Sequence, residues 1–436
     1  MGPLRRIVER FWFLPGVMCL AAVALSELLI TLDTHLDEPV RSSWSRVLFY
    51  RVGESGTRDI LGTIATATLG VAGTTFSITM AVLALTSSSY GPRLVRNFMA
   101  DRANQMVLGV FVATFLYSLL VLRSVGGSGG VPEGGSFVPH LAVNAAIVLA
   151  LANVAAMVYF IHHISDSIQI STLSGGVRTD LHRVIDRTFP AAPPGDPSTE
   201  LGDPPLPLRA RVTAREDGYL QVVRHQSLLK LARRQGFEAV LLVRPGQYVM
   251  NGTPMLALHA TRDIEPDAVD KARRLLEIDN ARSPHQDIDF AVQQLTEMAV
   301  RALSPGTNDP NTAINALDDL SSGLATLASR PVPSGVLRDE QGVVRVRLDV
   351  PDPVQIVTDV LDRLRWHASA SPSVMHAALT LIERVGARAH APALVVALTS
   401  QIGLLRDAFV TAGHHAHDVD RFDLRAVSVS QNMPHC

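Results

Sequence analysis

Residues 60–86 read ILGTIATATLGVAGTTFSITMAVLALT, a stretch without a single charged side chain. A helix of ~20 residues, at ~1.5 Å per residue, crosses the ~30 Å hydrocarbon core of a bilayer, so this stretch is long enough to span it. Similar apolar runs are Leu14 to Leu32, Met106 to Leu122 and His140 to Ile161, and none follows them. We therefore expect an α-helical membrane domain of four transmembrane helices over residues 1–163, followed by a cytoplasmic α+β part.

The composition agrees with this division of the chain. Hydrophobic residues make up 47% and charged residues 18%, and the formal net charge is −2. Binders of nucleic acid are usually basic, so no nucleic-acid partner is expected, whereas the lipid bilayer is. The two cysteines, Cys19 and Cys436, are too few for a disulfide framework or a cysteine metal site. We expect no cofactor and no metal, and we interpret His414, His415 and His417 as part of an exposed tail.

Arginines in the short loops predict the orientation of the spans, because such loops carry more arginine on the cytoplasmic side. The N-terminal segment holds Arg5, Arg6 and Arg10, and the loop after the second run holds Arg93 and Arg96. The four arginines of the first loop, residues 33–59, oppose this assignment. Four spans with a cytoplasmic N-terminus return the C-terminal part to the cytoplasm. Lys230 and Lys271 are the only lysines, and this use of arginine together with abundant alanine indicates a GC-rich bacterial genome. We therefore expect a multi-pass protein of the bacterial inner membrane with both termini cytoplasmic.

Small and polar residues recur every three or four positions along the second run, which places them on one helical face. They are Thr63, Thr66, Gly70, Gly73, Thr74 and Ser77. In one interpretation, the small side chains let two helices pack closely, with the hydroxyls bonded to backbone. In the other, the face lines a hydrated pathway between helices or subunits. The face carries no charge that would select an ion, which favours the packing interpretation.

Two histidines, His162 and His163, close the fourth run at its predicted cytoplasmic end. Adjacent residues point ~100° apart on a helix, so the pair cannot chelate one ion without further ligands. We interpret them as membrane-interface residues that contact lipid headgroups or another part of the protein.

The remainder of the chain divides by its pattern of polar and apolar residues. Residues 164–207 predict a helical extension and a proline-rich linker, and residues 208–262 predict a small β-sandwich-like module. Residues 263–412 predict a bundle of helices, and residues 413–436 a flexible tail. The turns around Pro245 and Asn251 are similar to those of biotinyl or lipoyl carriers. No lysine lies between Lys230 and Lys271 to carry such a group, so a carrier role is disfavoured.

The segment Ser304 to Pro310 predicts a turn between two antiparallel helices, with Asn308 or Asp309 as N-cap and Pro310 in the first turn. Helix-capping chemistry explains these residue types. A cytoplasmic binding site formed by Arg301, Asn308 and Asp309 is the alternative.

Several long blocks resemble a bacterial family of predicted membrane proteins, domain of unknown function 2254. They include residues 73–123, FVPHLAV (137–143), YFIHHI (159–164), RPGQYVMNGTPM (244–255) and RALSPGTNDPNTA (301–313). The resemblance runs in order from about Arg10 to about Ala389. It implies a multi-pass bacterial protein and carries no activity over to any residue.

No enzyme is expected, because motifs that might indicate one fail in context. GESG, residues 53–56, lies in a polar loop, and no phosphate-binding loop, HExxH or dinucleotide fingerprint is present. The face on the second run and the large C-terminal part favour a homo-oligomeric channel or transport-related protein gated by its cytoplasmic domain. The alternative is a non-conducting membrane receptor or scaffold whose cytoplasmic domain binds a ligand or protein. The sequence names neither an ion nor a ligand.

Overall fold

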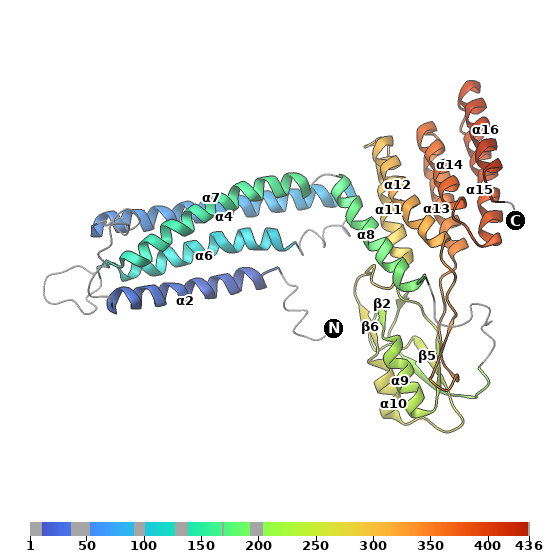
Figure 1. The fold of residues 1–436 in the computed structure, drawn as a ribbon, viewed down its shortest axis with the longest axis horizontal. Coiled ribbons are helices and arrows are strands. Elements are labelled where there is room, and N and C mark those ends of the chain that lie inside the picture. Colours follow the sequence, from blue (N-terminus) through green and yellow to red (C-terminus); the bar gives the residue numbers. More distant parts are fainter. Residues whose placement is uncertain are drawn as a thin grey trace. The chain divides into compact units, whose positions relative to one another are not determined.

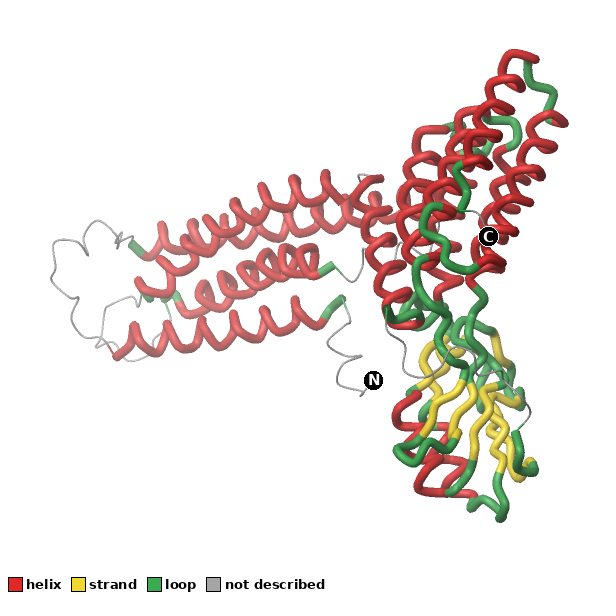
Figure 2. Tube along the Cα trace, turned by 45° about the vertical axis from the view of Figure 1, so that its right-hand side comes forward, coloured by secondary structure: helices red, strands yellow, loops and turns green. Residues whose placement is uncertain are grey.

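The computed structural model describes residues 11–35, 53–90, 101–126, 138–167, 170–191 and 204–434. The chain forms two compact units, Met1–Thr172 and Leu173–Cys436. We call them the membrane unit and the C-terminal unit and describe each by itself (Figures 1 and 2).

The described part of the membrane unit is built from four long helices that lie alongside one another (Figure 1). They are α2 (Phe13–His35), α4 (Glu54–Tyr90), α6 (Arg102–Ser124) and α7 (His140–Ser167). Helix α6 lies at the centre and packs against the other three. Its Gly109 permits close approach of α2, since a Cβ there would lie 2.6 Å from the Met18 sulfur and 3.2 Å from the Pro15 Cα.

Large apolar side chains cover the outside of this unit. On α7, Val148, Leu151, Val154 and Val158 are each more than 60% exposed. A water-soluble bundle would bury such residues, whereas hydrocarbon accepts them. The unit therefore has the surface of a protein that lies in a membrane.

Five of the described helices are long and apolar enough to cross a membrane, by length and composition. Four are those of the membrane unit, and the fifth is α15 (Pro392–Thr411) in the C-terminal unit. Helix α15 packs against α13, α14 and α16, with Leu398, Leu405 and Phe409 buried. The count of four spans stays a prediction.

The C-terminal unit contains a β module and a helical bundle (Figure 2). Helix α8 (Ile170–Thr188) comes first in sequence. The strands of the module are β1 (Leu208–Thr213), β2 (Gly218–Val223), β3 (Glu238–Leu241), β4 (Tyr248–Val249), β5 (Pro254–His259), β6 (Leu276–Asp279), β7 (Val336–Arg338) and β8 (Val344–Arg347). They form a sheet of order β1-β5-β3-β8-β7 and a second of order β4-β2-β6.

Two short helices, α9 (His225–Gln235) and α10 (Pro266–Arg273), accompany the sheets. The core of the module includes Val212, Leu220, Leu228, Phe237 and Leu258, which are fully buried. Most strand pairs are antiparallel, but β3 and β8 are parallel, with Ala239 opposite Val346.

The bundle contains α11 (Ile288–Ala302), α12 (Pro310–Ala328), α13 (Pro353–Ala368), α14 (Pro372–Gly386), α15 and α16 (Ala416–Gln431). Helices α12 to α15 each begin at a proline, whose fixed φ and missing N–H suit the first turn. One face of α11 is buried in the bundle and carries Phe290, Gln294, Met298 and Ala302.

Two expectations for this unit were wrong. Residues 263–412 are not purely helical, because β6, β7 and β8 complete the sheets through partners distant in sequence, which local periodicity does not reveal. The expected flexible tail contains helix α16, where Phe422 and Val429 are fully buried and where His415 is the N-cap. His415 and His417 are exposed, as expected, but they lie at the start of an ordered helix, and His414 is partly buried, with its Nε2 2.7 Å from the carbonyl oxygen of Ser369.

Candidate functional site

The predicted small and polar face of α4 lies on the outside of the membrane unit. Thr63, Thr66, Gly70, Gly73, Thr74 and Ser77 are all exposed. The hydroxyls of Thr74 and Ser77 donate to the carbonyls of Gly70 (3.1 Å) and Gly73 (2.9 Å) within the same helix. A Cβ at Gly70 or Gly73 would meet nothing within 4 Å. Within one copy of the chain, this face neither packs against another described helix nor lines an interior.

A different set of polar residues faces the interior of the membrane unit, and the sequence reasoning missed it. The buried polar side chains are Ser26, Thr57, Thr68, Thr75, Thr79, Asn104, Gln105, Thr114, Ser118 and Asn153. Neither nitrogen nor oxygen of the Asn104 amide has a hydrogen-bond partner, and the same is true of the Ser118 hydroxyl and the Asn153 Nδ2. Asn153 lies inside the fourth apolar run, which is the sequence signal that would have indicated it, whereas Asn104 lies just before the third run.

The two predicted interface histidines differ in their surroundings. His162 is exposed, whereas His163 is partly buried and its Nε2 lies 2.5 Å from Oδ2 of Asp101. Asp101 is also the N-cap of α6, where it accepts from the N–H of Ala103. The ring of Tyr159 stacks on that of His163 at 5.5 Å. One end of α7 is therefore tied to the start of α6 by an acid and an imidazole.

The other end of α7 is held by α2. The carboxylate of Asp33 accepts from the N–H groups of Leu141 and Ala142, each at 3.1 Å. These are among the first N–H groups of α7, which have no partner within their own helix. The hydroxyl of Tyr117 donates to the carbonyl of Ala142 at 2.8 Å. Ionisable groups thus lie at both ends of the interior.

The turn between α11 and α12 has the predicted N-cap at Asp309, whose carboxylate accepts from the N–H of Thr312 at 3.1 Å. Hydrogen bonds from the hydroxyl and N–H of Thr312 hold the pKa of Asp309 below its ordinary value. Asn308 adopts a left-handed φ of 42°. Arg301 instead pairs with Glu297, at 2.9 Å. The turn brings Asn308 and Asp309 together, but Arg301 is committed to its own helix.

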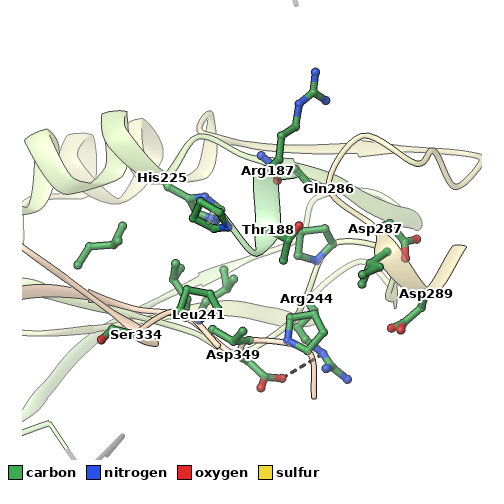
Figure 3. A pocket seen from close by; sticks show the side chains of 18 residues that line it. Arg187, Thr188, His225, Leu241, Arg244, Gln286, Asp287, Asp289, Ser334 and Asp349 are labelled. Carbon is green, nitrogen blue, oxygen red and sulfur yellow. Dashed lines mark ion pairs between the residues drawn. The ribbon is translucent and has the colours of Figure 1, made fainter. Parts of the chain in front are cut away.

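A cavity of about 200 Å³ in the C-terminal unit is a site that the sequence did not indicate (Figure 3). Its polar lining comprises Arg187, Thr188, His225, Arg244, Gln286, Asp287, Asp289, Ser334 and Asp349. Leucines, isoleucine, valine and prolines form the rest of the wall. The labelled side chains come from the end of α8, the start of α9, the loop after β3 and the start of α11, among others (Figure 3).

The lining of this cavity includes the nearly fully buried Asp287. It caps α11 by accepting from the N–H of Phe290 at 2.9 Å, and both its oxygens accept from Arg282, at 2.8 and 2.9 Å. Gly246, with φ +93°, lies against it so closely that a Cβ would be 2.2 Å from Oδ2. The Arg-Pro-Gly turn therefore needs glycine at this position.

Two titratable groups of the cavity have shifted pKa values. Burial lowers the pKa of His225, so its imidazole is neutral near pH 7. Partial burial of the Asp289 carboxylate, followed by the charge of Asp287, raises the pKa of Asp289, although the residue is exposed overall. Arg244 and Arg282 oppose that rise. Asp289 also borders a second cavity of about 240 Å³, lined by Arg282, Asp359 and Arg363 among others.

The cavity combines cationic, anionic and neutral hydrogen-bonding groups with an apolar wall. Arg244 is paired with Asp349 at 3.1 Å, and Arg187 donates to Nδ1 of His285 at 2.9 Å. Such a lining suits a small polar organic molecule. Within the described ranges, no group of three or more histidine, cysteine or acidic side chains is placed to hold a metal ion.

Comparison with known proteins agrees with the membrane character of the chain. Residues 8–384 match a family described as "Predicted membrane protein (DUF2254)". An uncharacterized protein of Mycobacterium tuberculosis (strain H37Rv) and one of Mycobacterium bovis are each 33% identical over 353 residues, which cover 80% of this chain and 67% of theirs. No solved structure matches significantly.

Proposed function

The chain belongs to the DUF2254 family of predicted membrane proteins. We propose that it is a homo-oligomeric, transport-related protein of the bacterial inner membrane. Copies associate along the exposed face of α4, and the C-terminal unit, on the cytoplasmic side, gates transport. The protein is not an enzyme in this proposal. The observation that supports it most directly is the exposure of Thr63, Thr66, Gly70, Gly73, Thr74 and Ser77 on a helix that lies in the membrane.

This face suits another helix better than it suits lipid. Small residues let helix backbones approach closely, and close packing drives helix association in membranes. Because Thr74 and Ser77 bond to their own helix, they can enter an apolar contact without an unsatisfied donor. We therefore favour the packing interpretation of the face, with the contact made between copies of the chain.

Crosslinking tests the contact between copies. In a chain with Cys19 and Cys436 replaced by serine, Thr74→Cys should give disulfide-linked dimers in membranes, because a disulfide requires Cα atoms within ~7 Å. Leu151→Cys, on the exposed side of α7, is the matched control and should stay monomeric. Equal crosslinking at both positions would contradict a specific contact along α4.

A bulky substitution provides a second test that leaves the single copy intact. Gly70→Leu meets no other part of the chain within 4 Å, so the fold of one copy should survive it. We expect the variant to run as a monomer in detergent, whereas the parent protein runs as an oligomer. A Gly70→Leu protein that retains its oligomeric state would rule out this face as the contact.

A membrane receptor that does not conduct is the second candidate, and the cavity in the C-terminal unit favours it. The end of α8, which follows the last helix of the membrane unit in sequence, supplies Arg187 and Thr188 to the wall. A ligand there would contact α8, the helix that follows α7 in sequence. Screening small polar metabolites for a rise in unfolding temperature that Arg244→Ala abolishes would identify such a ligand. A stabilising ligand together with absence of flux would favour the receptor over transport.

A further inference from the structure

Several polar side-chain atoms inside the membrane unit have no hydrogen-bond partner, and a bilayer around the unit cannot supply one. Asn104, Ser118 and Asn153 are at least 95% buried, and their side-chain atoms named above have no hydrogen-bond partner. In a water-soluble protein, opening of the structure would expose such groups to solvent. A bilayer core offers neither donors nor acceptors, so groups of this kind need partners inside the protein.

The buried polar residues are distributed along the length of the unit. On α6, Asn104 and Thr114 are about 15 Å apart along the axis and Thr114 and Ser118 about 6 Å, from the helical rise of ~1.5 Å per residue. Helices α4 and α6 run in opposite directions, since Arg58 at the start of α4 donates to the carbonyl of Val125 just after α6, at 3.0 Å. Thr79 of α4 therefore lies toward the Asn104 end and Thr68 toward the Ser118 end.

Helix α7 completes the series. It is antiparallel to α6, as the contact of Asp101 with His163 at one end and that of Tyr117 with Ala142 toward the other require. Between these contacts, the hydroxyl of Thr114 lies 3.5 Å from Oδ1 of Asn153. Polar groups from three helices therefore follow one another along the axis of the membrane unit, inside the packed helices.

The ends of this interior carry groups that exchange protons with water. Asp101 and His163 pair at one end, where Arg102 and His162 are also present. Asp33 of α2 lies at the other end, beside the start of α7 at His140. The groups between them are neutral amides and hydroxyls. A metal cation or an anion would meet no compensating charge there, whereas a proton can pass along hydrogen bonds between neutral oxygens.

We propose that water enters the interior between α4, α6 and α7 and forms a proton path from the Asp101–His163 pair to Asp33. This inference rests on the proposed transport function and names the proton as the cargo. The unpartnered amide of Asn104, the Nδ2 of Asn153 and the hydroxyl of Ser118 hold the water molecules. Each transfer breaks one O–H bond and forms the next, so a proton leaves one end for each that enters the other.

Proton entry into liposomes tests this path. The full-length protein is reconstituted with a pH-sensitive dye inside, and an inward proton gradient is applied with K⁺ and valinomycin to balance charge. We expect acidification faster than in protein-free liposomes. Asn153→Leu and Thr114→Val should return the rate to that of protein-free liposomes, because each removes a polar group from the interior at similar volume.

Thr31→Val is the matched control, because it makes the same change as Thr114→Val at an exposed position of α2, where the hydroxyl donates to a carbonyl of its own helix. It should keep the parent rate. Circular dichroism and the unfolding temperature establish that the interior variants remain folded, and Ser118→Ala provides a third, smaller interior change. Unchanged proton entry in folded Asn153→Leu and Thr114→Val would overturn the path.

Parallel assays separate this inference from the proposed function. Flux of K⁺ or Cl⁻ without proton entry would disprove the proton as cargo and leave the transport function standing. Absence of flux for every ion, from a protein that remains oligomeric, would overturn both.

Discussion

At the scale of single residues, Gly246 of the C-terminal unit is restricted in two ways. Its φ of +93° already favours glycine, and Asp287 occupies the space that a Cβ would need. Gly252 has a similar φ of +88° but nothing within 4 Å of the same point. Comparing substitutions at these two glycines therefore separates the cost of backbone strain from the cost of collision with a side chain.

Gly246→Ala is expected to lower the free energy of unfolding by more than Gly252→Ala does. Backbone strain alone should cost about 1–3 kcal/mol at either position, and displacement of Asp287 from Arg282 should add to it at Gly246. Urea unfolding of the two variants beside the parent measures the difference. Equal losses would show that Asp287 moves without cost.

Asp309→Ala should lower the free energy of unfolding by about 0.5–2 kcal/mol, because the side chain caps α12. Thr312 supplies its N–H to that carboxylate, so Asp309→Asn should recover most of the loss. Denaturant unfolding gives the value. If a variant as stable as the parent lost transport activity, the turn would instead be a binding site.

The lowered pKa of His376 indicates how acid should affect the stability of the bundle in the C-terminal unit. Burial, followed by the charges of Arg421 and Arg425, lowers its pKa. Its ring lies 5.3 Å from that of Phe422. His376 binds a proton less tightly in the folded state than in the unfolded chain. Its contribution to the free energy of unfolding is therefore complete above the unfolded pKa of ~6.5 and is lost as the pH falls below that value.

The unfolding temperature of the parent should thus fall more between pH 7.5 and pH 5.5 than that of His376→Gln, which cannot titrate. Parallel curves for the two proteins would assign the acid sensitivity to other groups.

The residues of the turn after α11 were predictable, because the signature of Asp309 and Pro310 is local in sequence. The contact of Asp101 with His163 was not, since it joins residues from different helices. Charge and spacing in the sequence identify candidate residues for an interaction at a helix end. Only the packing of α6 against α7 decides which of them form a pair.

At the scale of elements, helix α4 shows what periodicity can and cannot provide. The spacing of its small residues correctly placed them on one face. Whether that face lies inside or outside depends on the neighbours of α4, and the opposite face, with Thr68, Thr75 and Thr79, is the buried one. Both faces of α4 are rich in threonine, so composition alone could not distinguish them.

Replacing glycine by alanine should have opposite effects on stability at two helical positions, because a neighbouring helix packs closely at only one of them. Gly323 in α12 faces Leu181 of α8, and a Cβ would lie 2.3 Å from a Leu181 methyl carbon. Gly403 in α15 is exposed and has nothing within 4 Å. Alanine favours helix over glycine by about 0.5–1 kcal/mol, while overpacking a core costs about 1–3 kcal/mol.

We therefore expect Gly403→Ala to raise the unfolding temperature and Gly323→Ala to lower it. Differential scanning calorimetry of both variants provides the measurement. A stabilising Gly323→Ala would show that α8 can shift away from α12 without loss.

For the whole molecule, the sequence predicted a membrane domain over residues 1–163 and a larger part after it, and the structure divides into two units at Thr172. The sequence did not identify helix α16 or the return of the chain to the β module after α12. The apolar character of α15, which also buries Leu398 and Phe409 in the bundle, leaves a second topology to be tested.

Cys436 at the end of the chain reports the orientation of the C-terminus. With four spans and a cytoplasmic N-terminus, an impermeant thiol reagent should label it only after the cells are permeabilised. Cys19→Ser removes the other thiol, and a cysteine introduced at Gly130 should react in intact cells. Labelling of Cys436 in intact cells would show either that the orientation is reversed or that α15 is a fifth span.

The parallel pairing of β8 with β3 has a consequence for synthesis on the ribosome. Strand β3 pairs with β5 soon after both are made, but its other edge stays open until β8 has been translated. At ~5–20 residues per second, the interval from Leu241 to Val344 lasts on the order of 5–20 s. An unpaired edge of that kind can recruit a strand from a neighbouring nascent chain. Polysomes that translate this protein should therefore depend on chaperones during that interval, well after the membrane helices have been inserted.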